Sequence, residues 1–186
     1  MKQFRFTFFI CSIFSSAGFL SAQSNIPNVL VDPSAANAEC TLIINPKNSN
    51  QILGAEIPDF IYRSTDAGLT WTRTNLSTFA STQISWDVAL AADTAGHYFY
   101  QAMDPNNLFR TLRSDDYGST WGTESSFGNS GCYEDKSWMT VDRSPASVYN
   151  GRIYSAWTLR YASGCDTAGY FFVNHSSDNG NTWSGK

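Results

Sequence analysis

Arg63–Trp71 reads RSTDAGLTW, and closely similar stretches return as RSDDYGSTW at Arg113–Trp121 and as HSSDNGNTW at His175–Trp183. Each stretch contains Ser-x-Asp-x-Gly-x-Thr-Trp, and we call these three segments box 1, box 2 and box 3. Five fixed residues match by chance at about one start in a few million, taking about one in twenty per position as ordinary usage. Three matches in 186 residues therefore indicate an internal repeat, which decides the fold before any single residue does.

The repeat extends beyond the boxes. Ahead of each box, two apolar runs flank a turn-rich connector, and Asn45, Asp93 and Asp142 each close the first run. A third run enters the box and a fourth leaves it. Runs such as HYFYQA (97–102) show the alternation and the aromatic residues typical of strands, and no segment has a sustained helical period. The pattern predicts an all-β fold of four-stranded antiparallel blades, because such units, repeated about every 50 to 60 residues, are the signature of a β-propeller.

The expected blades span about 39–80, 81–128 and 129–186. Three blades cannot close a ring without leaving sheet edges and aromatic faces exposed. We therefore expect 23–186 to be the N-terminal part of a longer propeller, truncated at the C-terminus.

The first residues have the features of a secretion signal. Lys2 and Arg5 precede an apolar, Ser-rich stretch that is short for a membrane span, and the small residue Ala22 stands before the expected cut. We expect 1–22 to be a signal peptide and the mature protein to be secreted or held at the cell surface. A retained membrane anchor is the alternative.

Composition argues against several classes of function. The formal net charge is −4 and no basic run interrupts the chain, so a nucleic-acid partner is not expected. No stretch after the signal is long and apolar enough to cross a membrane. The chain has two histidines and no Cys-x-x-Cys pair, so neither a metal site nor a cofactor is expected.

Three cysteines remain in the mature chain, and export permits disulfides. Cys132 lies just before the first strand of the third blade, and Cys165 lies between its second and third strands. Both positions fall at the same end of one blade, so we expect a Cys132–Cys165 bond. Cys40 is then free or paired outside this sequence.

The boxes have a structural and a catalytic interpretation. In the structural one, the Asp side chain accepts hydrogen bonds from its own turn, the Gly supplies a positive φ, and the Trp packs between neighbouring sheets. The catalytic one uses three identical carboxylates, although acid–base chemistry needs groups in different roles. We favour the structural one for all fifteen positions, which are Ser64, Asp66, Gly68, Thr70, Trp71, Ser114, Asp116, Gly118, Thr120, Trp121, Ser176, Asp178, Gly180, Thr182 and Trp183.

The box resembles the Asp-box, or bacterial neuraminidase repeat, of sialidase-like β-propellers. The stretch EDKSWMTVDRSPASVYNGRIYSAWT (134–158) is similar to one common in exported bacterial sialidase-like proteins. The resemblance implies a six-bladed propeller, with the boxes on the face away from the ligand. It implies a glycoside hydrolase or a carbohydrate-binding module that meets extracellular glycans or glycoproteins. True sialidases carry a first arginine in a Phe/Tyr-Arg-Ile-Pro motif, whereas this chain has AEIPDFIYRS (55–64).

Candidate site residues follow from aligning the three copies. Six residues before Asn45, Asp93 and Asp142 stand Glu39, Asp87 and Lys136, and we expect these to ring the mouth of the channel. Candidate catalytic carboxylates are Asp135, Glu134 and Asp87. Glu134 and Asp135 are adjacent on an extended segment, so only one of them faces a ligand. We expect Trp86 and Trp138 either to stack on a sugar or to pack between blades. Asp135 and Lys136 either contact a ligand or have a local role in an ion pair or a turn.

Two hypotheses about function stay open at this point. One is an exported glycoside hydrolase, sialidase-like, that uses carboxylates at the channel mouth. The other is a non-catalytic propeller that serves as a surface binding or scaffold module. The family prior and the 134–158 stretch favour the first, and the absent arginine motif favours the second.

Overall fold

The structure of the chain is a computed structural model that describes residues 28–34, 39–78, 80, 84, 86–128, 132–160 and 170–185. The expected signal peptide, 1–22, and Cys165 lie outside these residues. The described strands are β1 (Cys40–Asn45), β2 (Asn48–Glu56), β3 (Phe60–Ser64), β4 (Thr72–Asn75), β5 (Trp86–Ala92), β6 (Tyr98–Met103), β7 (Leu108–Ser114), β8 (Gly122–Gly128), β9 (Tyr133–Val141), β10 (Ile153–Arg160) and β11 (Phe171–Ser176), with a short 3-10 helix at Leu76–Thr78.

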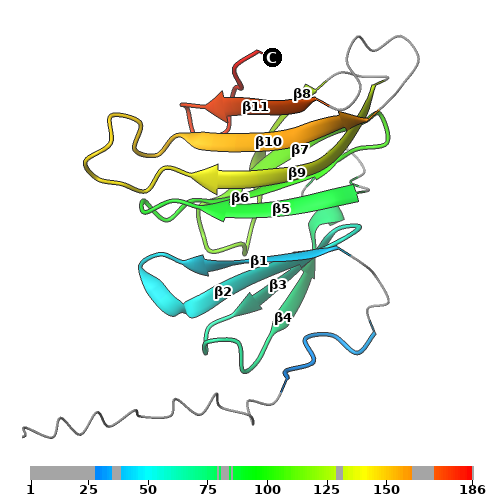
Figure 1. The fold of residues 1–186 in the computed structure, drawn as a ribbon. Coiled ribbons are helices and arrows are strands. Elements are labelled where there is room, and N and C mark those ends of the chain that lie inside the picture. Colours follow the sequence, from blue (N-terminus) through cyan, green and yellow to red (C-terminus); the bar gives the residue numbers. More distant parts are fainter. Residues whose placement is uncertain are drawn as a thin grey trace, which may run out of the picture.

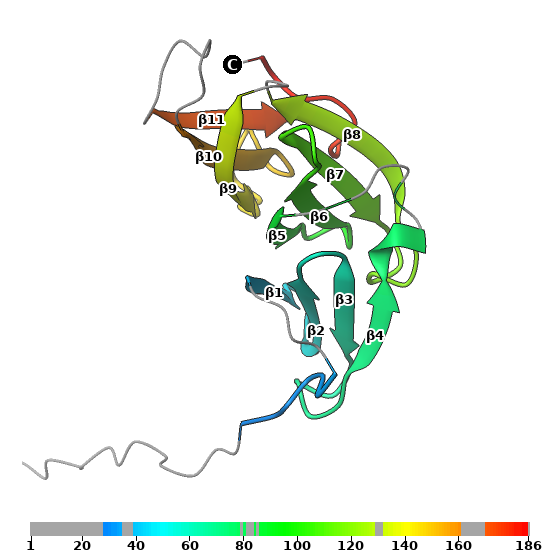
Figure 2. The same cartoon turned by 90° about the vertical axis from the view of Figure 1, so that its right-hand side faces the viewer.

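The strands form three antiparallel meanders. Their orders are β1-β2-β3-β4, β5-β6-β7-β8 and β9-β10-β11, and we call these sheets blade 1, blade 2 and blade 3. Figure 1 shows the sheets one above another, and Figure 2 shows them fanned into an arc with β1, β5 and β9 along its inner side. This radial arrangement confirms the predicted β-propeller class of fold.

Burial follows from the position of each blade in the arc. Blade 2 lies between the other two, and every residue of its β6 is buried, as is every residue of β5 after Trp86. In blade 3, by contrast, β9 and β10 alternate between buried and more exposed residues, because only one face of that sheet is covered.

The core lies between blades rather than within one. Leu53 and Ile61 of blade 1 pack with Leu90, Tyr100 and Trp121 of blade 2 in one apolar cluster. Burying a side chain of this size contributes about 1.5–3 kcal/mol. Trp183 of box 3 packs against a second cluster, which joins blade 2 to blade 3. Trp121 and Trp183 thus bridge neighbouring sheets, whereas Trp71 lies on the uncovered face of blade 1 and lines a groove there.

Each box is closed by its own side chains. In box 1, the Gly68 N–H donates to Ser64 Oγ at 2.8 Å, and Ser64 Oγ donates to Asp66 Oδ1 at 2.7 Å. The Thr70 N–H and hydroxyl donate to the two Asp66 carboxylate oxygens at 2.9 and 2.6 Å. Boxes 2 and 3 repeat these four bonds at 2.6 to 2.9 Å. The box is therefore a hydrogen-bonded turn between a third and a fourth strand.

The box glycine also determines how blades pack. It has a φ of 91° in box 1, 70° in box 2 and 83° in box 3, a region that favours glycine. A Cβ on Gly118 would lie 2.7 Å from Leu53 Cδ2 of blade 1, and one on Gly180 would lie 3.6 Å from Phe99 Cδ1 of blade 2. Tyr117, beside Gly118, donates its hydroxyl to the Ile52 carbonyl at 2.8 Å. Boxes 2 and 3 thus fasten each blade to the one before it.

Candidate functional site

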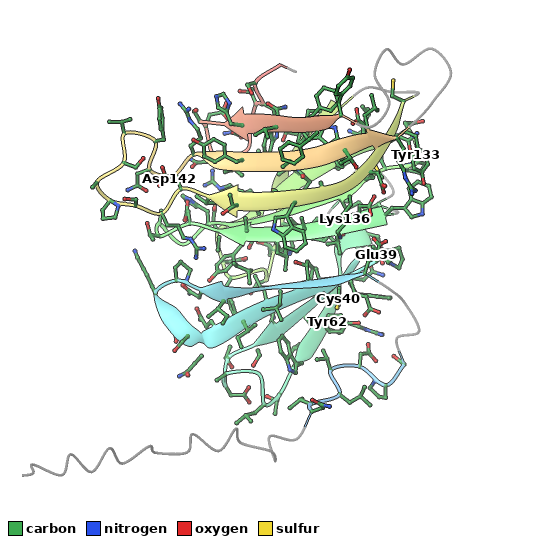
Figure 3. All side chains as sticks on the ribbon, viewed as in Figure 1. Glu39, Cys40, Tyr62, Tyr133, Lys136 and Asp142 are labelled. Atoms are coloured by element: carbon green, nitrogen blue, oxygen red, sulfur yellow. The ribbon has the colours of Figure 1, made fainter. Side chains whose placement is uncertain are left out.

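The two ends of the sheets carry different sets of residues. The boxes and the β1–β2, β5–β6 and β9–β10 turns lie at one end, which we call the box end. Figure 3 shows Asp142 at this end and Glu39 and Lys136 at the opposite end, which we call the rim end. The candidate residues Glu39, Asp87 and Lys136 therefore lie at the rim end, at or near the beginning of the inner strands.

Glu39, Asp87 and Lys136 share an unusual backbone conformation. Their φ values are 58°, 59° and 34°, in the left-handed region that few non-glycine residues adopt. The pairing of β5 with β6 shifts register between Trp86 and Ala89, next to Asp87. Such irregularities turn a side chain away from the regular pleat and recur beside active sites. The structure repeats this backbone feature near the rim end of each inner strand: Glu39 precedes β1, Asp87 is the second residue of β5 and Lys136 is the fourth residue of β9.

Hydrogen bonds link the three residues across the blades. The Asp87 N–H donates to Glu39 Oε2 at 3.2 Å, which joins blade 2 to blade 1. The Lys136 N–H donates to Asp87 Oδ2 at 3.1 Å, which joins blade 3 to blade 2. Lys136 Nζ donates to the Val88 carbonyl at 3.3 Å. Glu39, Asp87 and Lys136 therefore form one connected cluster, which we call the rim cluster.

Asp87 is the electrostatically unusual member of the rim cluster. Its side chain is buried, and burial raises the pKa of its carboxyl group from 3.8 to about 6. The Lys136 N–H opposes this shift, while the nearby carboxylates of Glu39 and Asp135 add to it. A carboxyl group with this pKa is partly protonated near neutral pH and can donate a proton.

The structure separates the other two candidate carboxylates. Asp135 Oδ2 lies 3.0 Å from Arg160 Nε in an ion pair on the surface of blade 3. Glu134 is fully buried. Because adjacent strand residues point to opposite sides, only Asp135 of this pair faces solvent. The ion-pair alternative for Asp135 is thus present, but with Arg160 as the partner rather than Lys136.

Aromatic side chains stand open near the rim cluster. Trp86 is 47% exposed and Trp138 is 65% exposed, so neither is packed between the described blades. Trp138 also lines a cavity of about 160 Å³ between the inner strands, together with Leu42 and Ala91. Exposed tryptophan faces beside polar groups suit stacking on the apolar face of a sugar ring.

The two described cysteines differ in their bonding state. Cys132 is disulfide-bonded, its predicted partner Cys165 lies outside the described residues, and Cys40 is exposed and free. Among the described residues, no group of three or more His, Cys, Asp and Glu side chains is arranged to hold a metal ion. The described part of the chain contains no helix with the length and apolarity needed to span a membrane.

Sequence reasoning placed the rim cluster but did not foresee its backbone. Counting back from the turn residues located Glu39, Asp87 and Lys136, yet no residue type at these positions signals a left-handed φ. The ion pair between Arg160 and Asp135 was also missed, because it joins residues of two strands, β9 and β10, that are 25 positions apart in the chain. No local pattern encodes a contact of that kind.

Known proteins resemble this chain only in part. No known family profile matches it. The chain is 30% identical over 141 residues to a xyloglucanase from Paenibacillus sp, and the matched part makes up 67% of this chain and 13% of that enzyme. A solved structure of YCF48 bound to D1 peptide has 12% sequence identity and a TM-score of 0.45, covering 86% of this chain and 46% of that one.

Proposed function

We propose that this chain belongs to an exported, glycan-engaging propeller whose rim end contacts the sugar. The observation that carries the proposal is the rim cluster itself: Asp87, with its raised pKa, directly follows the exposed Trp86 in β5, and the exposed Trp138 stands two residues after Lys136 in β9. An aromatic platform next to a group that can donate a proton is the combination that glycoside chemistry uses. The similarity to a xyloglucanase supports the same class of ligand.

The charge of the rim favours a neutral glycan over a sialic acid. Glu39, Asp87 and Asp135 place three carboxyl groups together, and Lys136 directs its ammonium group at a backbone carbonyl. A sugar carboxylate would be repelled here, since its usual partner is a bidentate arginine. Arg160 is already paired with Asp135. We therefore propose a neutral β-glucan-type polysaccharide as the ligand, in place of the sialosides that the box resemblance suggested.

If the full protein is a hydrolase, Asp87 is the preferred general acid. Its raised pKa keeps a proton available near neutral pH, and the neighbouring Glu39 carboxylate helps hold that proton in place. The proton would pass to the glycosidic oxygen as the bond to the leaving sugar breaks. Hydrolysis also needs a second carboxylate on the other side of that bond, as base or nucleophile. The geometry thus favours Asp87 over Asp135, which is held by Arg160.

A non-catalytic binding module is the second candidate. The observation in its favour is that the backbone N–H groups of the rim cluster already bond to the Asp87 and Glu39 carboxylates. Such bonds make the cluster a rigid part of the surface. In that case the exposed tryptophans would provide the contact, and Asp87 would only hold the rim together.

The test uses the full-length protein on xyloglucan, mixed-linkage glucan and a sialoside, with reducing-end release and affinity electrophoresis as the two measurements. We expect binding or cleavage of the neutral polymers only. Asp87→Asn should lower turnover by about 10²–10⁴-fold while binding persists. Trp138→Ala should weaken binding, and Asp115→Asn, at the box end, should change neither. Activity on the sialoside alone would contradict the proposal, and binding without turnover would select the non-catalytic module.

A further inference from the structure

The connection between β9 and β10 is longer than its counterparts in the other two blades. It spans residues 142–152, whereas the β1–β2 and β5–β6 connections span 46–47 and 93–97. Figure 1 shows it extending beyond the sheets at the box end. Hydrogen bonds within it, such as the one from the Gly151 N–H to the Asp142 carbonyl at 2.8 Å, hold its shape. We call 142–152 the blade 3 loop, and a loop fixed in this way presents its side chains in one arrangement.

The blade 3 loop and box 3 enclose a small polar hollow. The hollow has a volume of about 190 Å³ and is lined by residues 148–152 of the loop and by Ser177 and Asn179 of box 3. These residues all lie in the two box-end connections of blade 3, and none belongs to a strand. The hollow therefore lies outside the sheet faces on which neighbouring blades pack.

Arg152 is the charged residue of this hollow. Its guanidinium carbon, Cζ, lies 4.1 Å from the centre of the Tyr149 ring, and this stacking fixes the orientation of the guanidinium plane. Among the described residues, Arg152 forms no ion pair with a carboxylate, and its Nε–H has no hydrogen-bond partner. A guanidinium group that is oriented but unpaired is suited to bidentate binding of a carboxylate.

Blade 2 supplies a carboxylate at the equivalent place from its own sequence. The strand registers make His97 of blade 2 equivalent to Arg152, and Asp115 of box 2 equivalent to Ser177. The Asp115 carboxylate lies 3.8 Å from His97 Nε2 and accepts hydrogen bonds from Arg113 at 2.6 and 2.9 Å. Blade 3 has only a hydroxyl at this position, so its arginine lacks the internal partner that blade 2 provides.

We propose that the hollow binds the carboxylate of an acidic sugar, a hexuronate unit of a polysaccharide, and that Arg152 holds this carboxylate. Ser177, Asn150 and Asn179 line the hollow with a hydroxyl and two amides, groups that hydrogen-bond to sugar hydroxyls. The ring of Tyr149, which is 49% exposed, is open to contact with the sugar ring. The volume suits one hexose-sized ring and leaves no space for the three-carbon tail and the acetamido group of a sialic acid.

The test is isothermal titration calorimetry on the full-length protein with trigalacturonate, its methyl ester and sialyllactose. We expect trigalacturonate alone to bind, with an affinity that falls as the salt concentration rises. The methyl ester keeps the sugar rings and removes their charge, so it isolates the contribution of the carboxylates. Arg152→Gln should weaken binding by about tenfold to a hundredfold, as expected when hydrogen bonds to a charged group are lost.

Ser177→Asp is the sharper variant, because it gives blade 3 the internal carboxylate that blade 2 already has. This carboxylate should compete with the ligand for Arg152 and weaken binding by a similar factor. Folding should persist, since box 2 carries Asp at the same position, and circular dichroism checks this. Arg143→Gln is the control: it removes the same charge from an exposed arginine of the loop that does not line the hollow, and should leave the affinity unchanged.

Three results would overturn the proposal. The first is a failure of trigalacturonate to bind, or equal binding of its methyl ester. The second is an unchanged affinity in either Arg152→Gln or Ser177→Asp. The third is an aspartate-rich peptide or sialyllactose that binds as tightly as trigalacturonate, which would assign the hollow to a different carboxylate ligand.

Discussion

Different features recur from blade to blade at the box end and at the rim end. At the box end the same side chains recur three times, and Asp66, Asp116 and Asp178 each bond to their own turn. At the rim end a left-handed φ recurs near the end of each inner strand, while the side chain changes from Glu to Asp to Lys. A side chain repeated in every blade is part of the scaffold. Left-handed residues of varied type also recur beside the box glycines, at Ala67, Tyr117 and Asn179, so the rim end is distinguished by its charged side chains rather than by its backbone.

The pKa values of the carboxyl groups also differ between the two ends. Hydrogen bonds from Thr70 and Ser64 lower the pKa of Asp66 to about 2. Burial beside other carboxylates raises the pKa of Asp87 to about 6. The box carboxylates are therefore fully charged and occupied, whereas the rim carboxyl group can exchange a proton near neutral pH.

The largest expected effect on stability is at the rim end, where Cys132 is disulfide-bonded. If its partner is Cys165, the bond closes a loop of about 33 residues, and Cys132→Ser should lower the free energy of unfolding by about 3–4 kcal/mol in the loop-entropy model. Urea unfolding measures the loss. Cys40→Ser is the control and should have little effect, because Cys40 is free and exposed. Non-reducing peptide mapping that finds Cys40 in a bridge would contradict the assignment.

The box glycines offer a comparison between two copies of one motif. Gly118→Ala and Gly180→Ala both place a Cβ at a positive φ, so the backbone strain is similar. Only the Cβ at position 118 would lie within 3 Å of another side chain, the fully buried Leu53. Gly118→Ala should therefore cost about 1–3 kcal/mol more than Gly180→Ala. If the two variants lost equal thermal stability, Leu53 would be able to move away from the added Cβ at little cost in free energy.

Removing a box carboxylate tests the structural role of the motif. Asp116→Ala leaves the Thr120 N–H and hydroxyl without their acceptor, and should lower the free energy of unfolding by about 1–3 kcal/mol. Asp115→Ala is the neighbouring control, since its side chain is 62% exposed. Glycan affinity of the folded fraction should not change. An unchanged melting temperature with lost binding or activity would reverse our interpretation of the boxes.

The smallest expected effects come from pH, and they have opposite signs at the two ends. Asp87 holds its proton more tightly when folded, so its contribution to stability is complete below about pH 4 and is lost as pH rises through about 6. Asp66 has a lowered pKa, so its contribution is present above about pH 4 and is lost as pH falls towards 2. Urea unfolding across this range should show the first decline disappear in Asp87→Asn and the second in Asp66→Asn. If both variants gave the same dependence of stability on pH, the proposed electrostatic difference between the rim end and the box end would be wrong.

The sequence by itself determined the class of fold and the location of the repeated parts. Three boxes at similar spacing, each preceded by alternating apolar runs, required four-strand units, because a turn with this side-chain bonding and a period of two residues are local properties. Counting back from the turn residues Asn45, Asp93 and Asp142 then located Glu39, Asp87 and Lys136 at equivalent positions, which share a left-handed φ.

Only the tertiary structure decided which of these residues is chemically distinctive. Asp87 and Glu39 carry the same functional group, and the raised pKa of Asp87 arises from its burial and from the carboxylates of Glu39, which precedes β1, and of Asp135 on β9. Likewise, Asp135 is set apart from Asp87 by Arg160, which reaches it from the neighbouring strand β10. These properties depend on distances between segments far apart in the chain, and no local pattern of residues encodes such distances.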